Sequence, residues 1–165
     1  MYNCDFTDAL INRQINLDIE VSDTLKELEN PYDTSVRQTQ GVDYSWDTAY
    51  YNGKYYCYFG IVPALLFFVP YRLVTGAYLQ CNIVVMLAYA VYMLFLDVVL
   101  IRIMRYTVPD VQFGVEVTGL AILNATVNIF HFAAEPSFYM VLYAVGLMFV
   151  AIGFCCFVFW YTGKR

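Results

Sequence analysis

The sequence predicts a mainly α-helical integral membrane protein: an extracytoplasmic loop domain with short helices and a β-hairpin, an interfacial helix, and then about three transmembrane helices. Two observations predict this class. The chain has 165 residues, of which 61% are hydrophobic and only 14% charged, and its mean hydropathy is +0.55. Soluble domains carry about 25% charged residues. The charge is also uneven, because residues 1–56 hold ten acidic and four basic side chains, a net charge of −6. The bilayer is therefore the expected solvent for the rest of the chain.

Three apolar stretches have the length of membrane-spanning helices, namely residues 77–101, 114–132 and 136–161. Each approaches the roughly 20 residues that a helix needs to cross about 30 Å of hydrocarbon. The stretch 61–76 differs from them, because it holds Pro63, Pro70 and Arg72 within a run too short to span comfortably. We expect this stretch to form an interfacial, juxtamembrane helix that leads into the first span.

Basic residues near the ends of the spans predict the orientation. Arg102 and Arg105 follow the first span, and Lys164 and Arg165 follow the third. Lys and Arg are retained on the cytoplasmic side, so residues 1–76 are expected outside if the stretch 61–76 does not cross. The predicted localisation is the cell membrane, multi-pass, with an extracytoplasmic N-terminal segment. We also expect the sequence to be an excerpt of a longer protein, because three spans are few for a transporter or membrane enzyme.

The N-terminal segment, residues 1–60, is predicted to form short helices and turns with a hairpin near residues 47–58. The pair Asn52-Gly53 lies between two aromatic runs of high strand propensity. This pattern is typical of a two-residue type I′ turn. Asn30 to Asp33 read as a turn, in which Asp33 is expected to pair with Arg37.

Several kinds of site are disfavoured by the composition. An acidic segment is a poor ligand for phosphates, so no nucleic-acid partner is expected. The five cysteines show no CxxC pair and no regular spacing, which predicts neither a zinc site nor a disulfide framework. No metal ligands and no cofactor are evident, and the need for a divalent cation is undecided.

A longer pattern in the outer segment resembles a known family. It comprises Asn30-Pro31-Tyr32-Asp33, Arg37, the run from Trp46 to Leu66, Pro70-Tyr71 and Thr75-Gly76. This pattern resembles the first extracytoplasmic loop of bacterial GT-C type membrane glycosyltransferases, relatives of the protein mannosyltransferases and of the aminoarabinose transferases that modify lipid A. The resemblance covers about Asp8 to Gly76.

The resemblance implies many transmembrane helices, juxtamembrane helices in the first loop, and a sugar donor carried on a polyprenyl phosphate. It also implies an acid near the start of that loop, which acts as base toward the acceptor hydroxyl. Asp5 and Asp8 are the carboxylates nearest that start, and Asp47 beside Trp46 is a third candidate. For Asp47 the alternative is structural, since it could cap the turn or meet Lys54.

The outer segment offers few cations for the phosphate of such a donor or of another membrane lipid. The candidates are Arg72, Lys54, Arg37 and Arg13. Arg72 is the best placed of them, near the predicted interface. Its alternative role is to extend toward lipid headgroups or water. The tyrosines of residues 44–58 could stack on sugar rings, but an aromatic belt at a membrane surface needs no ligand.

Four polar residues recur at helical spacing near the end of the second predicted span: Asn124, Asn128, His131 and Glu135. They would share one helix face. They could form the wall of an outward-opening cavity, or they could hydrogen-bond neighbouring helices together, which we favour.

The sequence therefore leads to a glycosyltransferase-like membrane protein as the first hypothesis. A non-enzymatic component of the membrane or cell envelope is the second, and a transporter subunit that relays protons through His131 and Glu135 is the third. An acidic pair directly after an upstream span would favour the enzyme.

Overall fold

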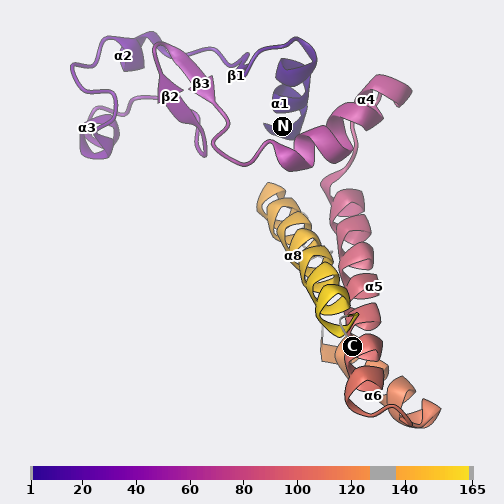
Figure 1. Ribbon diagram of the computed structural model, residues 1–165. Helices are drawn as coiled ribbons and strands as arrows, with labels where there is room; N and C mark the ends of the chain where they lie inside the picture. The colour runs from indigo at the N-terminus through magenta and orange to yellow at the C-terminus, as the bar shows by residue number, and fades with distance from the viewer. Residues whose placement is uncertain (1, 127–136, 164–165) are drawn as a thin grey trace. The chain divides into compact units, whose positions relative to one another are not determined.

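The structure of the protein, a computed structural model, describes residues 2–126 and 137–163. The contacts divide the chain into two compact units, Met1–Leu79 and Gln80–Arg165. We refer to them as the N-terminal unit and the C-terminal unit. The elements of both are labelled in Figure 1.

The N-terminal unit consists of short helices around a small sheet. Its elements, in order, are α1 (Tyr2–Ile11), β1 (Asn16–Leu17), α2 (Asp23–Lys26), α3 (Thr34–Thr39), β2 (Ala49–Tyr51), β3 (Lys54–Tyr56), the π-helix η1 (Ala64–Phe68) and α4 (Val69–Thr75).

The predicted hairpin turn at Asn52-Gly53 is confirmed. Strands β2 and β3 pair antiparallel, with Tyr51 opposite Lys54 across the turn. Asn52 and Gly53 have φ angles of 48° and 72°, as both central positions of a type I′ turn require. Strand β1, which the sequence analysis did not predict, pairs with the other edge of β3 and gives the order β1-β3-β2.

Helix α3 begins at Thr34, directly after the predicted turn at residues 30–33, which is confirmed by a hydrogen bond from the Asp33 N–H to the Asn30 carbonyl oxygen (3.3 Å). The Asp33 carboxylate accepts hydrogen bonds from the backbone N–H groups of Ser35 (2.8 Å) and Val36 (3.3 Å). Such an N-cap satisfies donors that the first helical turn leaves without a partner. The expected role of Asp33, pairing with Arg37, is therefore corrected to helix capping, and Arg37 instead lies over the ring of Tyr44 at 4.3 Å.

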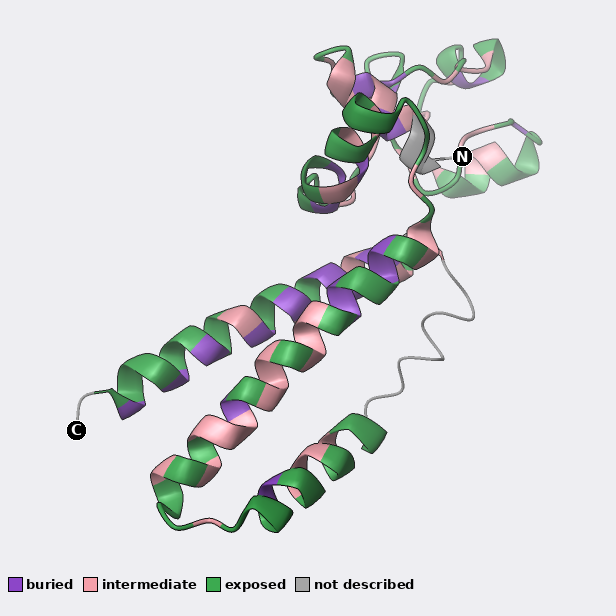
Figure 2. Ribbon diagram, turned by 90° about the vertical axis from the view of Figure 1, so that its right-hand side faces the viewer, coloured by how far each residue is buried: buried purple, intermediate pink, exposed green. Residues whose placement is uncertain are grey.

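One hydrophobic core joins the elements of the N-terminal unit. It contains the buried side chains Phe6, Leu17, Leu25, Val42, Tyr55 and Ala64. These residues come from α1, β1, α2, the segment before the hairpin, β3 and η1. Full burial of a Leu or Phe side chain contributes roughly 1.5–3 kcal/mol. Helix α1 contacts both η1 and α4 in this unit. Figure 2 shows the buried residues of the chain in purple.

The segment predicted as an interfacial helix is helical over residues 64–75, and its place at a membrane surface remains a prediction. The π-helical turn η1 ends at Phe68, two residues before Pro70, the second residue of α4. A proline ring clashes with the carbonyl four residues earlier in a regular helix, and a wider turn relieves that clash. Helix α4 ends at Gly76, whose φ of 70° is the left-handed conformation that favours glycine.

The C-terminal unit is helical. It contains α5 (Cys81–Thr107), α6 (Phe113–Thr126) and α8 (Phe138–Thr162). Two helices, Cys81–Thr107 and Tyr139–Thr162, are long and apolar enough to cross a membrane. They pack side by side. The second predicted span, residues 114–132, coincides with α6 only to Thr126, and its remainder lies outside the described residues. The described 14 residues of α6 are fewer than a span needs.

Polar contacts join α5 to the other helices of the C-terminal unit. Arg105 makes two hydrogen bonds to the buried Glu116 carboxylate, from Nε (2.6 Å) and from Nη2 (2.9 Å). Arg102 donates from Nε to Oγ1 of Thr162 (2.8 Å). Both arginines lie within α5, which continues to Thr107, and their partners lie on α6 and α8. The end of the first membrane span near residue 101 remains a prediction.

Candidate functional site

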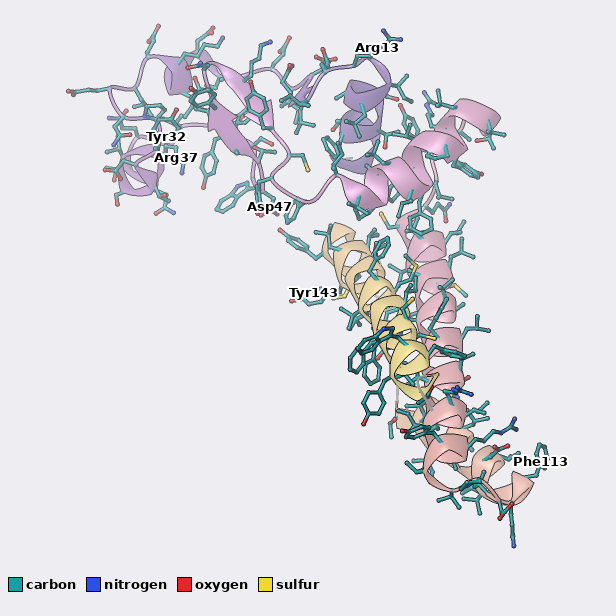
Figure 3. The ribbon with its side chains drawn as sticks, viewed as in Figure 1. Arg13, Tyr32, Arg37, Asp47, Phe113 and Tyr143 are labelled. Atoms are coloured by element: carbon teal, nitrogen blue, oxygen red, sulfur yellow. The ribbon has the colours of Figure 1, made fainter. Side chains whose placement is uncertain are left out.

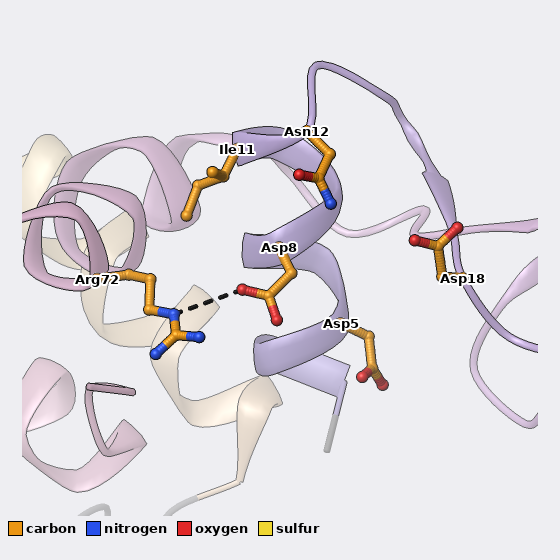
Figure 4. A pocket seen from close by; sticks show the side chains of 6 residues that line it. All are labelled: Asp5, Asp8, Ile11, Asn12, Asp18 and Arg72. Carbon is orange, nitrogen blue, oxygen red and sulfur yellow. Dashed lines mark ion pairs between the residues drawn. The ribbon is translucent and has the colours of Figure 1, made fainter. Parts of the chain in front are cut away.

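An open hollow of about 360 Å³ lies on the N-terminal unit between α1 and α4. Its lining residues are Asp5, Asp8, Ile11, Asn12, Asp18 and Arg72. We call it the acidic hollow, because it combines three carboxylates with one guanidinium group. Figure 4 shows Asp5 and Asp8 on α1, with Arg72 reaching toward Asp8 from α4.

Helix geometry explains why α1 and the residue that follows it contribute four of the six lining residues. Residues three and four apart lie on the same face of a helix, and Asp5, Asp8, Ile11 and Asn12 follow this spacing. The opposite face of α1 holds Phe6 and Ala9, which are buried. Burial of that face directs the two carboxylates outward, into the hollow.

Arg72 is fixed by several partners at once. Its Nε lies 3.5 Å from Oδ1 of Asp8, and its Nη2 donates to the hydroxyl of Tyr78 at 3.3 Å. The guanidinium also lies over the Tyr78 ring, 4.0 Å from its centroid. A further hydrogen bond runs from Nη1 to the carbonyl oxygen of Gly76. The left-handed Gly76 turns the chain so that Tyr78 returns to Arg72.

Tyr78 closes the network by donating its hydroxyl proton to Oδ2 of Asp8. Both carboxylate oxygens of Asp8 are therefore engaged, one by Arg72 and one by Tyr78. The side chains of Arg72 and Asp8 keep 28% and 41% of their surfaces exposed. The guanidinium is thus held in a defined position and still reaches solvent, so it can meet an anion in the hollow.

The structure brings together three of the predicted site residues and separates the other four in the outer segment. Asp5, Asp8 and Arg72 line the acidic hollow, whereas Asp47, Lys54, Arg37 and Arg13 do not. Arg13 follows the end of α1 and is exposed, and Arg37 belongs to α3 (Figure 3). Lys54 begins β3 and is exposed.

Asp47 lies before the hairpin rather than at the hollow. It is exposed and has a φ of 57°. Partial desolvation first, and then the Asp47 carboxylate, raise the pKa of the Tyr58 hydroxyl above its ordinary value.

The predicted cavity wall is described only at its first residue. Asn124 donates from Nδ2 to Oδ1 of Asp97 on α5 (2.9 Å) and to the backbone carbonyl of Leu120 (2.8 Å). The hydrogen bond to Asp97 joins α6 to α5. For Asn124 it agrees with the interpretation favoured above, in which these polar residues form hydrogen bonds between helices. Asn128, His131 and Glu135 lie outside the described residues.

Sequence reasoning missed three polar residues of this region: Asn12, Asp18 and Tyr78. Asn12 continues the spacing that starts at Asp5, so the helical periodicity could have found it. Asp18 and Tyr78 depend on β1 and on the turn at Gly76, which bring distant residues to the same place. Among residues 2–126 and 137–163, no group of three or more His, Cys, Asp or Glu side chains is arranged to hold a metal ion.

Comparisons with protein-family models, with curated proteins and with solved structures find no match to this chain.

Proposed function

We propose that this chain is part of a polytopic membrane glycosyltransferase that moves a sugar from a polyprenyl-phosphate donor to an acceptor hydroxyl on the outer face of the membrane. One observation carries the proposal: Asp5 and Asp8, selected from the sequence as possible bases, line the same hollow as Arg72, selected as a possible phosphate ligand. Two helices with the length and composition of membrane spans support a membrane setting.

Arg72 is the residue that binds the donor phosphate in this proposal. A guanidinium offers several donors in a fixed fork, which suits phosphate oxygens. Asp8, Tyr78 and Gly76 already hold this side chain in position, so little rotamer entropy is lost when the phosphate binds. Asp8 therefore acts as a positioning residue for Arg72.

Asp5 is the proposed general base. It shares the hollow with Arg72 but does not belong to the ion pair, which is made by Asp8. A carboxylate within reach of an acceptor hydroxyl takes its proton as the glycosidic bond forms, and such catalysis contributes typically 10²–10⁴-fold. Transfer breaks the bond between the sugar and the phosphate, and the released polyprenyl phosphate keeps the negative charge near Arg72.

The distribution of charge in the hollow favours different positions for the donor phosphate and the acceptor hydroxyl. Three carboxylates repel an anion, and one guanidinium attracts it. The phosphate is therefore expected on the Arg72 side, toward α4, and the neutral acceptor hydroxyl beside Asp5. A donor that entered from the Asp5 and Asp18 side would meet like charges.

The test is a transfer assay in membranes from cells that produce the protein, with a radiolabelled polyprenyl-phosphate sugar. Asp5→Asn and Arg72→Gln should each lower transfer by about 10²-fold or more at equal protein abundance. Glu29→Gln and Lys26→Gln are matched controls, because they neutralise exposed residues of the same unit that do not line the hollow.

Two results would contradict the proposal. Wild-type transfer by both hollow variants would show that the hollow is not the site. Losses that only follow the amount of folded protein would make these residues structural, and the non-enzymatic membrane component would then be the better description.

A further inference from the structure

An exposed row of apolar side chains runs along the helical segment formed by η1 and α4. It consists of Leu65, Leu66, Leu73 and Val74, and we call it the outer stripe. These residues are 50%, 47%, 67% and 86% exposed. None of them lines the acidic hollow, so the outer stripe is a separate surface of the N-terminal unit.

The π-helical turn η1 aligns the two halves of the outer stripe. A turn of π-helix holds about one residue more than a turn of α-helix. Side chains seven residues apart share a face of a regular α-helix, so a π-helical turn between them brings residues eight apart onto the same face. Leu65 and Leu73 have this spacing, and so do Leu66 and Val74. The four side chains therefore form one continuous apolar face.

A different face of the same helical segment packs into the N-terminal unit. Ala64 and Phe68 are buried, and Ala64 belongs to the core of the unit. Arg72 follows Phe68 by four residues and pairs with Asp8. The segment is thus also apolar on its exposed face, where a helix at the surface of a soluble protein carries polar side chains. A contiguous exposed apolar patch of this kind marks a surface that binds a protein or a membrane.

The chain itself keeps the outer stripe close to any membrane that α5 crosses. Five residues, 76–80, separate the end of α4 from the start of α5, and such a segment extends over at most about 18 Å. Helix α5 has the length and composition of a membrane span. The bilayer surface at which α5 begins is therefore within reach of the outer stripe.

The distribution of charge along the chain also favours lipid as the occupant. All ten acidic side chains of the N-terminal unit precede residue 48, and residues 48–96 contain only Lys54 and Arg72 as charged side chains. Carboxylates are repelled by lipid phosphates, and the segment that carries the stripe has none. A stable protein interface takes about 20–30 residues a side. Four side chains are far fewer, so a second copy of the chain or another protein is the less suitable occupant.

We propose that the outer stripe is a membrane-binding surface, with Leu65, Leu66, Leu73 and Val74 inserted at the boundary between the lipid headgroups and the acyl chains. The segment then lies in the plane of that boundary with its apolar face in the lipid. The sequence predicts an interfacial helix over residues 61–76, and the exposed face assigns the side chains that enter the lipid. This inference does not depend on the transfer reaction.

Photolabelling from the bilayer tests the proposal on the wild-type chain. The protein is reconstituted in phosphatidylcholine nanodiscs in which part of the lipid carries a diazirine near the start of an acyl chain, and labelled residues are mapped by mass spectrometry. We expect label on the four residues of the outer stripe several-fold above that on the exposed residues of α3 (Thr34–Thr39). Label on the stripe no higher than that on α3 would overturn the proposal.

Spin-label accessibility distinguishes a lipid occupant from a protein occupant. In a cysteine-free variant, nitroxides are attached at Leu66→Cys, at Val74→Cys and, as a matched control, at Gln38→Cys, an exposed position of α3. Oxygen is apolar and concentrates among acyl chains, whereas a nickel chelate stays in water. The ratio of oxygen to nickel accessibility should therefore be several-fold higher at positions 66 and 74 than at position 38.

Two results of this measurement would overturn the proposal. A ratio equal to that at position 38 would place the stripe in water. Low accessibility to both reagents, or spin–spin broadening between copies, would identify a protein as the occupant. Neither measurement involves sugar transfer, so the failure of this proposal is distinct from the failure of the proposed function.

Discussion

Nε of Arg72 lies 3.5 Å from Oδ1 of Asp8, so that the last helix of the N-terminal unit is tied to its first. The Tyr78 hydroxyl bridges the same two side chains. Asp8 thus forms one network at the edge of the acidic hollow with Arg72 and Tyr78, which lie more than 60 residues later in the sequence. The proposed position of Arg72 depends on this network. The coupling free energy between Asp8 and Arg72 can be measured.

A double-mutant cycle should show that Asp8 and Arg72 act as a pair. Both side chains are partly exposed, and exposed ion pairs typically contribute about 0.2–1 kcal/mol. Asp8→Asn and Arg72→Gln should therefore each destabilise the protein slightly, and the double variant should lose less than the sum of the two. Chemical unfolding of the detergent-solubilised protein provides the free energies. Strict additivity would show that the pair is not coupled.

Gly53→Ala should destabilise the protein more than Gly60→Ala. A Cβ atom at either position would meet open space, but only Gly53 has a positive φ, 72°. A non-glycine residue in that conformation costs roughly 1–2 kcal/mol. The comparison therefore isolates backbone conformation from packing. Equal thermal stability of the two variants would show that the turn does not constrain the hairpin.

Glu116→Gln should loosen the attachment of α6 to α5. The Glu116 carboxylate is buried and accepts two hydrogen bonds from Arg105, whose side chain is 62% exposed. Hydrogen bonds to charged groups contribute about 1.5–3 kcal/mol, and the exposure of Arg105 places the expected loss at the lower end. Arg105→Lys should lose part of the same stability, because lysine cannot bind in the bidentate manner. Asp110→Asn, an exposed acid before α6, is the control for unfolding measurements.

The predicted orientation can be tested with a cysteine-free variant that carries Glu29→Cys, since Glu29 is exposed on the N-terminal unit. Arg102 and Arg105 lie toward the end of α5 and are expected on the cytoplasmic side. A membrane-impermeant maleimide should therefore label the introduced thiol in intact cells. Labelling that appears only after permeabilisation would place this unit inside.

Local features of the fold were the ones that sequence reasoning predicted well. The Asn52-Gly53 turn depends on two residues and their flanking strands, so its pattern was sufficient. The turn from Asn30 to Asp33 is also local, and the structure contains it directly before α3. The contacts of Arg105 with Glu116 and of Arg102 with Thr162 were not predicted, because these partners lie on other helices and local patterns do not reveal them.

The sequence identified residues of the candidate site, but it did not show that they lie together. Asp5, Asp8 and Arg72 were all named from the sequence, together with four residues that lie elsewhere on the unit. Their selection rested on charge and on position near a predicted interface. What brings three of them together is the packing of α1 against η1 and α4 around the shared core. The sequence favoured Arg72 over Arg13 because of its place near the predicted interface. It could not show that Arg72 meets Asp8, because that packing joins residues from the two ends of the unit.

Photocrosslinking tests the central claim most directly, that the acidic hollow binds a lipid-linked sugar through Arg72. Membranes containing the protein are irradiated with a polyprenyl-phosphate sugar that carries a diazirine on the sugar, and the labelled peptides are mapped by mass spectrometry. We predict label within Tyr2–Ile11 and Val69–Thr75, competition by unmodified polyprenyl phosphate, and at least about tenfold less label in Arg72→Gln. Label confined to other segments, or label in these two helices that Arg72→Gln leaves unchanged, would contradict the account.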